Sequence, residues 1–65
     1  MDTAEVVRER QTERGISTAE LARRTGIGYE ALRVSLEGKR KISANELVAL
    51  CMELELDISD FEPER

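Results

Sequence analysis

The side chains of this chain that could do chemistry are charged and hydrogen-bonding groups. Arg33 carries parallel N–H donors that suit a pair of acceptors, and Glu30 offers two acceptor oxygens three residues earlier. Lys39-Arg40-Lys41 adds three consecutive cations, which we expect in an exposed loop. Groups of this kind bind polar or anionic surfaces, so the pattern favours recognition.

The composition argues against an enzyme. There is no histidine, no paired-carboxylate pattern and no phosphate-binding glycine loop, and the pair Gly26-x-Gly28 lacks the preceding strand of a dinucleotide fingerprint. One cysteine excludes an internal disulfide framework, and one cysteine with no histidine argues against a zinc site; Cys51 falls in an apolar stripe where a small buried side chain is expected. We therefore expect no catalytic residues, no metal and no cofactor.

Length limits the organisation of the chain. Sixty-five residues make one domain at most, which we place at residues 1–62 with a tail at 63–65 beginning at Pro63. No apolar run approaches the ~18 residues that a membrane span needs. A single thiol and no signal peptide indicate the cytoplasm.

Charge is unevenly distributed along the chain. The formal net charge is −4, yet residues 1–41 hold nine basic and seven acidic residues, whereas residues 42–65 hold one basic and seven acidic residues. The first part is therefore at +2 and the second at −6. Such segregation is compatible with a binding surface for an anion, and it also suits a solubilising acidic segment.

Capping residues and glycines predict an all-α domain of four or five short helices. Asp2 or Thr3 can cap the first helix, and two capping boxes, Ser17 to Glu20 and Ser43 to Glu46, open later ones. Glycines end the first three helices. The expected helices span residues 3–14, 18–25, 29–37 and 44–54, with a short fifth near 59–62.

Two of these helices are joined by a short turn. Gly26 can supply the positive φ of a tight turn, Ile27 can wedge between the helices against Leu21 and Leu32, and Gly28 can cap the next helix. Two short helices connected in this way form the helix-turn-helix pattern.

Several spaced segments then resemble one known family. "GISTAELARRTGIGYEAL", "LEGKRKIS" and "LVALCMELELDISDF" are similar to the corresponding parts of the lambda-repressor/Cro-like (Xre-type) helix-turn-helix domain, over roughly residues 7–61. The resemblance implies five helices around one core, with the helix near 29–37 entering the major groove of double-stranded DNA. Departures from the usual family pattern occur at Arg10, Thr18, Ser35 and Glu55, and at the pair Gln11 and Leu36.

The resemblance also assigns contacts by position. Base contacts would come from Tyr29, Glu30, Arg33 and Val34. Phosphate contacts would come from Thr18, Gly28, Lys39, Arg40 and Lys41.

The side-chain chemistry turns these assignments into a base preference. Arg33 can donate to guanine O6 and N7, Glu30 can accept from cytosine N4, and Val34 or Tyr29 can contact a thymine methyl, which predicts a G·C-containing half-site. Alternatives remain for each residue. Arg33 could contact phosphate or solvent, Glu30 could pair with Arg33 or Arg23, and Tyr29 could pack over the preceding helix.

The leading interpretation is a sequence-specific transcriptional regulator, a repressor of phage or mobile-element type, that acts as a dimer on a pseudo-palindrome. The dimer surface would be the C-terminal apolar segment, although Leu54 and Ile58 at least are better explained by closure of the core. The segment consists of Leu54, Leu56, Ile58 and Phe61. The alternative is an antitoxin-like or anti-repressor-like interaction module that uses its acidic C-terminal face.

Overall fold

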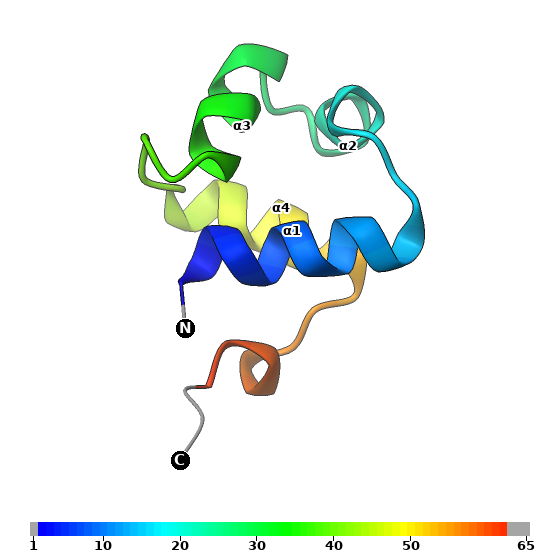
Figure 1. Cartoon of the computed structure of the whole chain (residues 1–65), viewed down its shortest axis with the longest axis vertical. Coiled ribbons are helices and arrows are strands. Elements are labelled where there is room, and N and C mark those ends of the chain that lie inside the picture. Colours follow the sequence, from blue (N-terminus) through cyan, green and yellow to red (C-terminus); the bar gives the residue numbers. More distant parts are fainter. Residues whose placement is uncertain (1, 63–65) are drawn as a thin grey trace.

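A computed structural model describes residues 2–62 and is all-helical over that range, as predicted (Figure 1). The α2 and α3 helices lie on one side of the α1–α4 pair, and the closing 3-10 helix η1 packs against α1 on the other side. The elements are α1 (Thr3–Arg14), α2 (Thr18–Thr25), α3 (Tyr29–Leu36), α4 (Ala44–Leu54) and η1 (Ile58–Phe61). The proposed tail at 63–65 lies outside the described residues.

An aliphatic core holds the four α-helices together. The buried cluster draws on every α-helix, and Leu21, Leu50 and Leu54 are completely shielded from solvent. Burying one such side chain is worth about 1.5–3 kcal/mol, which is a large share of the stability of so small a domain. The cluster comprises Val7, Leu21, Ala22, Leu32, Leu36, Leu50 and Leu54.

The helix boundaries agree closely with the capping residues in the sequence. Gly15 and Gly26 follow α1 and α2 in the left-handed conformation, with φ of 66° and 77°. At the start of α4, the Ser43 hydroxyl accepts from the Glu46 N–H, and the Glu46 carboxylate accepts from the Ser43 N–H. This second capping box is confirmed.

Three details of the helix ends differ from expectation. Asp2 occupies the N-cap position of α1, but its side chain makes no capping hydrogen bond. Ser17 caps α2 by accepting from the Glu20 N–H, whereas the Glu20 carboxylate turns to Arg23 and Arg24 instead of bonding back. The arginines offer stronger, charge-assisted donors than a single backbone N–H, so that capping box is only half formed. The third difference is that α3 ends at residue 36 and the closing helix spans 58–61.

Arg10 joins the end of α4 to α1 and η1. Its Nη1 donates to the carbonyl oxygens of Leu54 (2.8 Å) and Glu55 (3.0 Å), and its Nη2 donates to Asp60 Oδ1 (3.3 Å). Glu55 lies in the left-handed region with φ of 55°, the conformation in which a helix end favours glycine. Arg14 forms an ion pair with the Glu55 carboxylate. Arg10 and Glu55, which both depart from the family pattern, therefore belong to one set of contacts that holds the C-terminal end of α4 in place.

The apolar C-terminal segment divides between core and surface. Leu54 is fully buried and Leu56 packs against the core, whereas Ile58 is 81% exposed. The expectation that Leu54 closes the core is confirmed. For Ile58 it is wrong, because η1 faces α1 with Asp60 and leaves Ile58 on its outer side.

Cys51 is partly buried and carries a free thiol. Burial, with a smaller contribution from the charge of Asp60, raises the pKa of this thiol, so it stays protonated and poorly nucleophilic. Within residues 2–62, no helix is long and apolar enough to cross a bilayer.

The turn between α2 and α3 gives a matched pair of substitutions. We expect Gly26→Ala to lower the free energy of unfolding by about 1 kcal/mol, because an added Cβ is disfavoured at φ of 77° even though no atom lies within 4 Å of it. Gly28→Ser is the control, since φ is −57° there and serine is a preferred N-cap residue. Urea denaturation should show the loss for Gly26→Ala alone. Equal losses from both variants would contradict the assignment of the strain to Gly26.

Candidate nucleic-acid interface

The turn that joins α2 to α3 is held by local hydrogen bonds. The Gly26 N–H donates to the Ala22 carbonyl (2.9 Å), and the Thr25 hydroxyl donates to the Leu21 carbonyl (2.8 Å). Ile27 is partly buried and packs against the core cluster, which anchors the middle of the turn. These contacts fix α3 relative to α2, so the outer face of α3 is presented in one orientation.

The α3 helix has a buried face and an outer face. Leu32, Ser35 and Leu36 are buried, whereas Tyr29 is 49% exposed and Glu30 is exposed beside it. Two further predicted contact residues lie one turn along: Arg33, whose side chain is 42% exposed, and Val34, which is partly exposed. The structure therefore brings all four predicted base-contacting residues to accessible positions on one short helix.

Arg33 lies between two carboxylates, that of Glu30 in its own helix and that of Glu37 directly after the helix. Its Nε and Nη2 donate to the two oxygens of Glu30 (3.0 and 2.9 Å), and its Nη1 donates to Glu37 (2.8 Å). The hydrogen bond from Arg33 holds the pKa of Glu30 below its usual range. Of the alternatives for Glu30, pairing with Arg33 is therefore realised in the free protein. Glu37 was missed, although its i,i+4 spacing from Arg33 was visible in the sequence.

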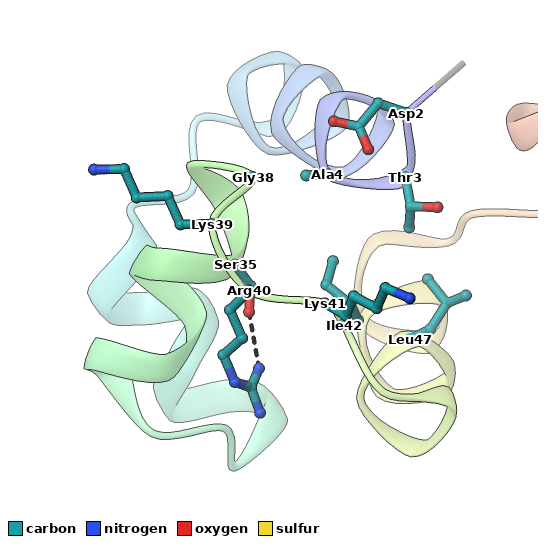
Figure 2. Close-up of a pocket in the computed structure, with 10 residues that line it drawn as sticks. All are labelled: Asp2, Thr3, Ala4, Ser35, Gly38, Lys39, Arg40, Lys41, Ile42 and Leu47. Atoms are coloured by element: carbon teal, nitrogen blue, oxygen red, sulfur yellow. Dashed lines mark hydrogen bonds between the residues drawn. The ribbon is translucent and has the colours of Figure 1, made fainter.

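The basic loop after α3 does not form a single cationic cluster. Figure 2 shows Lys39 and Lys41 pointing in different directions, while Arg40 folds back onto α3. The loop lines a cavity of about 400 Å³, whose other walls include the first residues of α1 and Leu47 of α4. The acidic Asp2 lies on the same cavity, which lowers its suitability for an anion.

Arg40 is the most constrained of the three cations. Its guanidinium donates to the hydroxyl of the buried Ser35 (2.8 Å) and to both carboxylate oxygens of Glu46 (3.0 and 2.9 Å). Ser35 departs from the family pattern, and its buried hydroxyl thus receives its hydrogen-bond donor from an arginine of the loop. Arg40 ties the end of α3 to the start of α4 and has few donors left for a phosphate.

Thr18 begins α2 at a partly exposed position. Its hydroxyl oxygen accepts a hydrogen bond from the Gln11 side-chain amide (3.1 Å), so the hydroxyl hydrogen remains able to donate outward. The Gln11 departure from the family pattern therefore orients Thr18. Thr18 and Gly28 both lie at N-terminal helix ends, whose free N–H groups favour an approaching anion.

The acidic C-terminal part is engaged with arginines of the rest of the domain. Glu55 pairs with Arg14, Asp60 with Arg10, and Glu53 with Arg24 at 3.9 Å. Hydrogen bonding by Arg14 lowers the pKa of Glu55. These carboxylates are internal partners in the described structure, and the acidic face offered to a basic protein partner is correspondingly smaller.

The α2 and α3 helices are short, are joined by a tight turn held by hydrogen bonds, and leave the outer face of α3 and nearby helix N-termini accessible. This arrangement defines a helix-turn-helix DNA-binding domain. The family model for the Cro/C1-type HTH DNA-binding domain matches residues 7–62, and the chain belongs to this family. No curated protein and no solved structure matches the chain.

The Glu46–Arg40 pair predicts a loss of stability in acid. Hydrogen bonding from Arg40, with the Ser43 N–H second, lowers the pKa of Glu46 to about 2 in the folded protein. Because the unfolded chain takes up this proton first, the stabilisation is present above the unfolded pKa and is lost as pH falls from about 5 toward 2. Urea denaturation at about pH 6 and about pH 3 should show a smaller change for Glu46→Gln than for the wild type. If both proteins lose the same free energy of unfolding between these pH values, Glu46 does not contribute to the loss of stability in acid.

Proposed function

We propose that this chain is a sequence-specific transcriptional repressor of phage or mobile-element type, a domain over residues 1–62 that acts in the cytoplasm. In this proposal α3 lies in the major groove of double-stranded DNA and reads bases through Arg33, Glu30, Tyr29 and Val34. Thr18, Gly28 and the basic loop Lys39–Lys41 contact the phosphates, and two copies occupy two half-sites. No catalytic step is part of the proposal.

The observation that supports this function best is the accessible face of α3. Four side chains with donor, acceptor and apolar character share a helix whose other face is locked into the core. A major groove presents the same kinds of groups in return, and an Arg–guanine pair is the commonest specific contact. Among the described ion pairs, Arg8 and Lys41 take no part, so Lys41 is the most available cation of the loop.

Selection of bound duplexes from a random pool tests the proposal. We expect enrichment of a G·C-containing pseudo-palindrome with half-site centres about one helical turn apart. Binding to the selected duplex should weaken steeply as salt increases, because phosphate contacts release counterions. No salt-sensitive binding at micromolar protein would overturn the proposal and would favour the antitoxin-like or anti-repressor-like module.

Glu30 should limit affinity while it supports specificity. We expect Glu30→Gln to raise affinity for random-sequence duplexes by up to about fivefold, because an exposed ion pair worth ~0.2–1 kcal/mol no longer has to break before Arg33 meets DNA. Discrimination at one G·C pair should fall at the same time. The control is Glu9→Gln on the exposed face of α1, which makes the same charge change. Identical gains in affinity from both variants in a gel shift would show that the effect comes from net charge and not from the pair between Glu30 and Arg33.

A further inference from the structure

One exposed helix face in this highly charged chain carries no charge. The exposed positions of α4 are Ala44, Asn45, Val48 and Met52. Val48 and Met52 lie one turn apart and are 58% and 77% exposed, and within residues 2–62 no element covers them. By contrast, the exposed positions of α1 are almost all Glu or Arg. An uncharged face of this kind is suited to docking against another apolar surface.

The charges at the two ends of α4 indicate what can cover this face. Lys39 and Lys41 precede the helix, whereas Glu53, whose pair with Arg24 is long at 3.9 Å, and Asp57, which takes no part in the described ion pairs, lie at or beyond its last turn. Two copies of α4 packed antiparallel would bring the basic end of each near the acidic end of the other and would oppose their helix dipoles favourably. Parallel packing would juxtapose like charges.

The spacing along α4 is also compatible with a symmetric pair. An antiparallel arrangement centred on Val48 places Ala44 of one copy opposite Met52 of the other, because both are four residues from the centre. A small residue then receives a long one on each side of the axis, which is the complementarity that an isologous contact needs. DNA does not suit this face, since its exposed residues include no cation.

We propose that the uncharged face of α4 is a self-association surface on which a second copy of this chain docks antiparallel. Each copy contributes only two large apolar side chains, so the area lies well below the ~1,200 Å² of a stable interface and the dimer is weak. This assigns the two-copy assembly of the proposed function to α4 instead of the C-terminal segment, whose Leu54 and Leu56 belong to the core side of the fold. The assembly itself forms without DNA.

Sedimentation equilibrium on the DNA-free chain, from roughly 10 µM to 1 mM, tests the surface. We expect a monomer–dimer equilibrium for the wild type and at least about tenfold weaker association for Val48→Glu, because two carboxylates would meet at the axis. Ile58→Glu is the matched control, since Ile58 is an apolar residue on η1 that is even more exposed than Val48. Dimers that survive Ile58→Glu but not Val48→Glu support the proposal. A monomeric wild type, or loss with Ile58→Glu alone, overturns it.

Cross-linking tests the orientation in the Cys51→Ser background. Under oxidation, a mixture of Ala44→Cys and Met52→Cys chains should form mainly the mixed disulfide, because the antiparallel arrangement places position 44 opposite position 52. Ala44→Cys chains that link mainly to each other would overturn the antiparallel arrangement. Both measurements omit DNA, so their failure is distinguishable from failure of the repressor function.

Discussion

Replacing Arg33 by alanine is expected to weaken binding to the selected duplex by about fivefold to a hundredfold and to remove the preference for guanine at one position of the half-site. A bidentate Arg–guanine pair contributes ~1–3 kcal/mol of discrimination, and no neighbouring side chain offers the same pair of donors. Competition gel shifts with duplexes that differ at a single base pair measure both quantities.

Charge complicates the alanine variant. Without Arg33, the carboxylates of Glu30 and Glu37 lose the cation that they share and face the phosphates unneutralised. Random-sequence binding should therefore fall as well. Arg33→Lys separates the two effects, because lysine keeps the charge but lacks the planar fork of donors. We expect Arg33→Lys to keep most random-sequence affinity while losing most of the discrimination.

The comparison with Lys39 completes this experiment. Lys39 is an exposed residue of the basic loop, and the one ion pair that it makes within residues 2–62, with Glu37 at 3.5 Å, is long. Lys39→Ala should weaken all duplexes alike and reduce the salt slope by about one. If Arg33→Lys discriminates as well as the wild type, or if Arg33→Ala affects all duplexes as uniformly as Lys39→Ala, Arg33 does not read bases.

The acids around Arg33 have a physical consequence for recognition. Each hydrogen bond to Glu30 or Glu37 must be exchanged for one to DNA, so the net gain from a correct base is smaller than for an unpaired arginine. At the same time, pairing restricts the rotamers of Arg33 and keeps it on the outer face of α3. The pairing of Arg33 with Glu30 and Glu37 thus lowers its affinity for the correct bases and also lowers its tendency to bind random DNA.

Local signals in the sequence were sufficient for most of the fold. Gly15, Gly26 and the Ser43–Glu46 box act within one turn of the chain, so they fixed the helix boundaries to within about one residue. The accessible position of Glu30 and Arg33 followed from helical periodicity once Leu32 and Leu36 were placed in the core.

Contacts between distant segments were beyond such reasoning. Arg10 and Leu54 are 44 residues apart, and nothing in the spacing of either residue reveals the hydrogen bond between them. Arg40 likewise was predicted to contact phosphate, whereas its bonds to Ser35 and Glu46 depend on how the loop returns to α4. The exposure of Ile58 depends on which side of η1 meets α1, a choice that four residues do not encode by periodicity.

Substituting Arg10 by methionine is expected to lower the free energy of unfolding by about 2–3 kcal/mol, a large effect for a residue that is partly accessible to solvent. The methionine keeps the apolar stem but leaves the Leu54 and Glu55 carbonyls and Asp60 Oδ1 without the donor that Arg10 supplies. For a domain of this size such a loss removes a large part of the total stability and lowers Tm by roughly 10 °C or more.

Arg14→Met is the matched control for Arg10→Met. It makes the same charge change on the same helix, but Arg14 makes one exposed ion pair, worth ~0–1 kcal/mol, with Glu55. Thermal and urea denaturation followed by circular dichroism should rank the two variants clearly. Equal losses would show that net charge, and not the hydrogen bonds from Arg10 to the end of α4, stabilises the domain. At a temperature where Arg10→Met is folded, its preference among duplexes should match the wild type, because η1 lies on the opposite side of the α1–α4 pair from α3 (Figure 1).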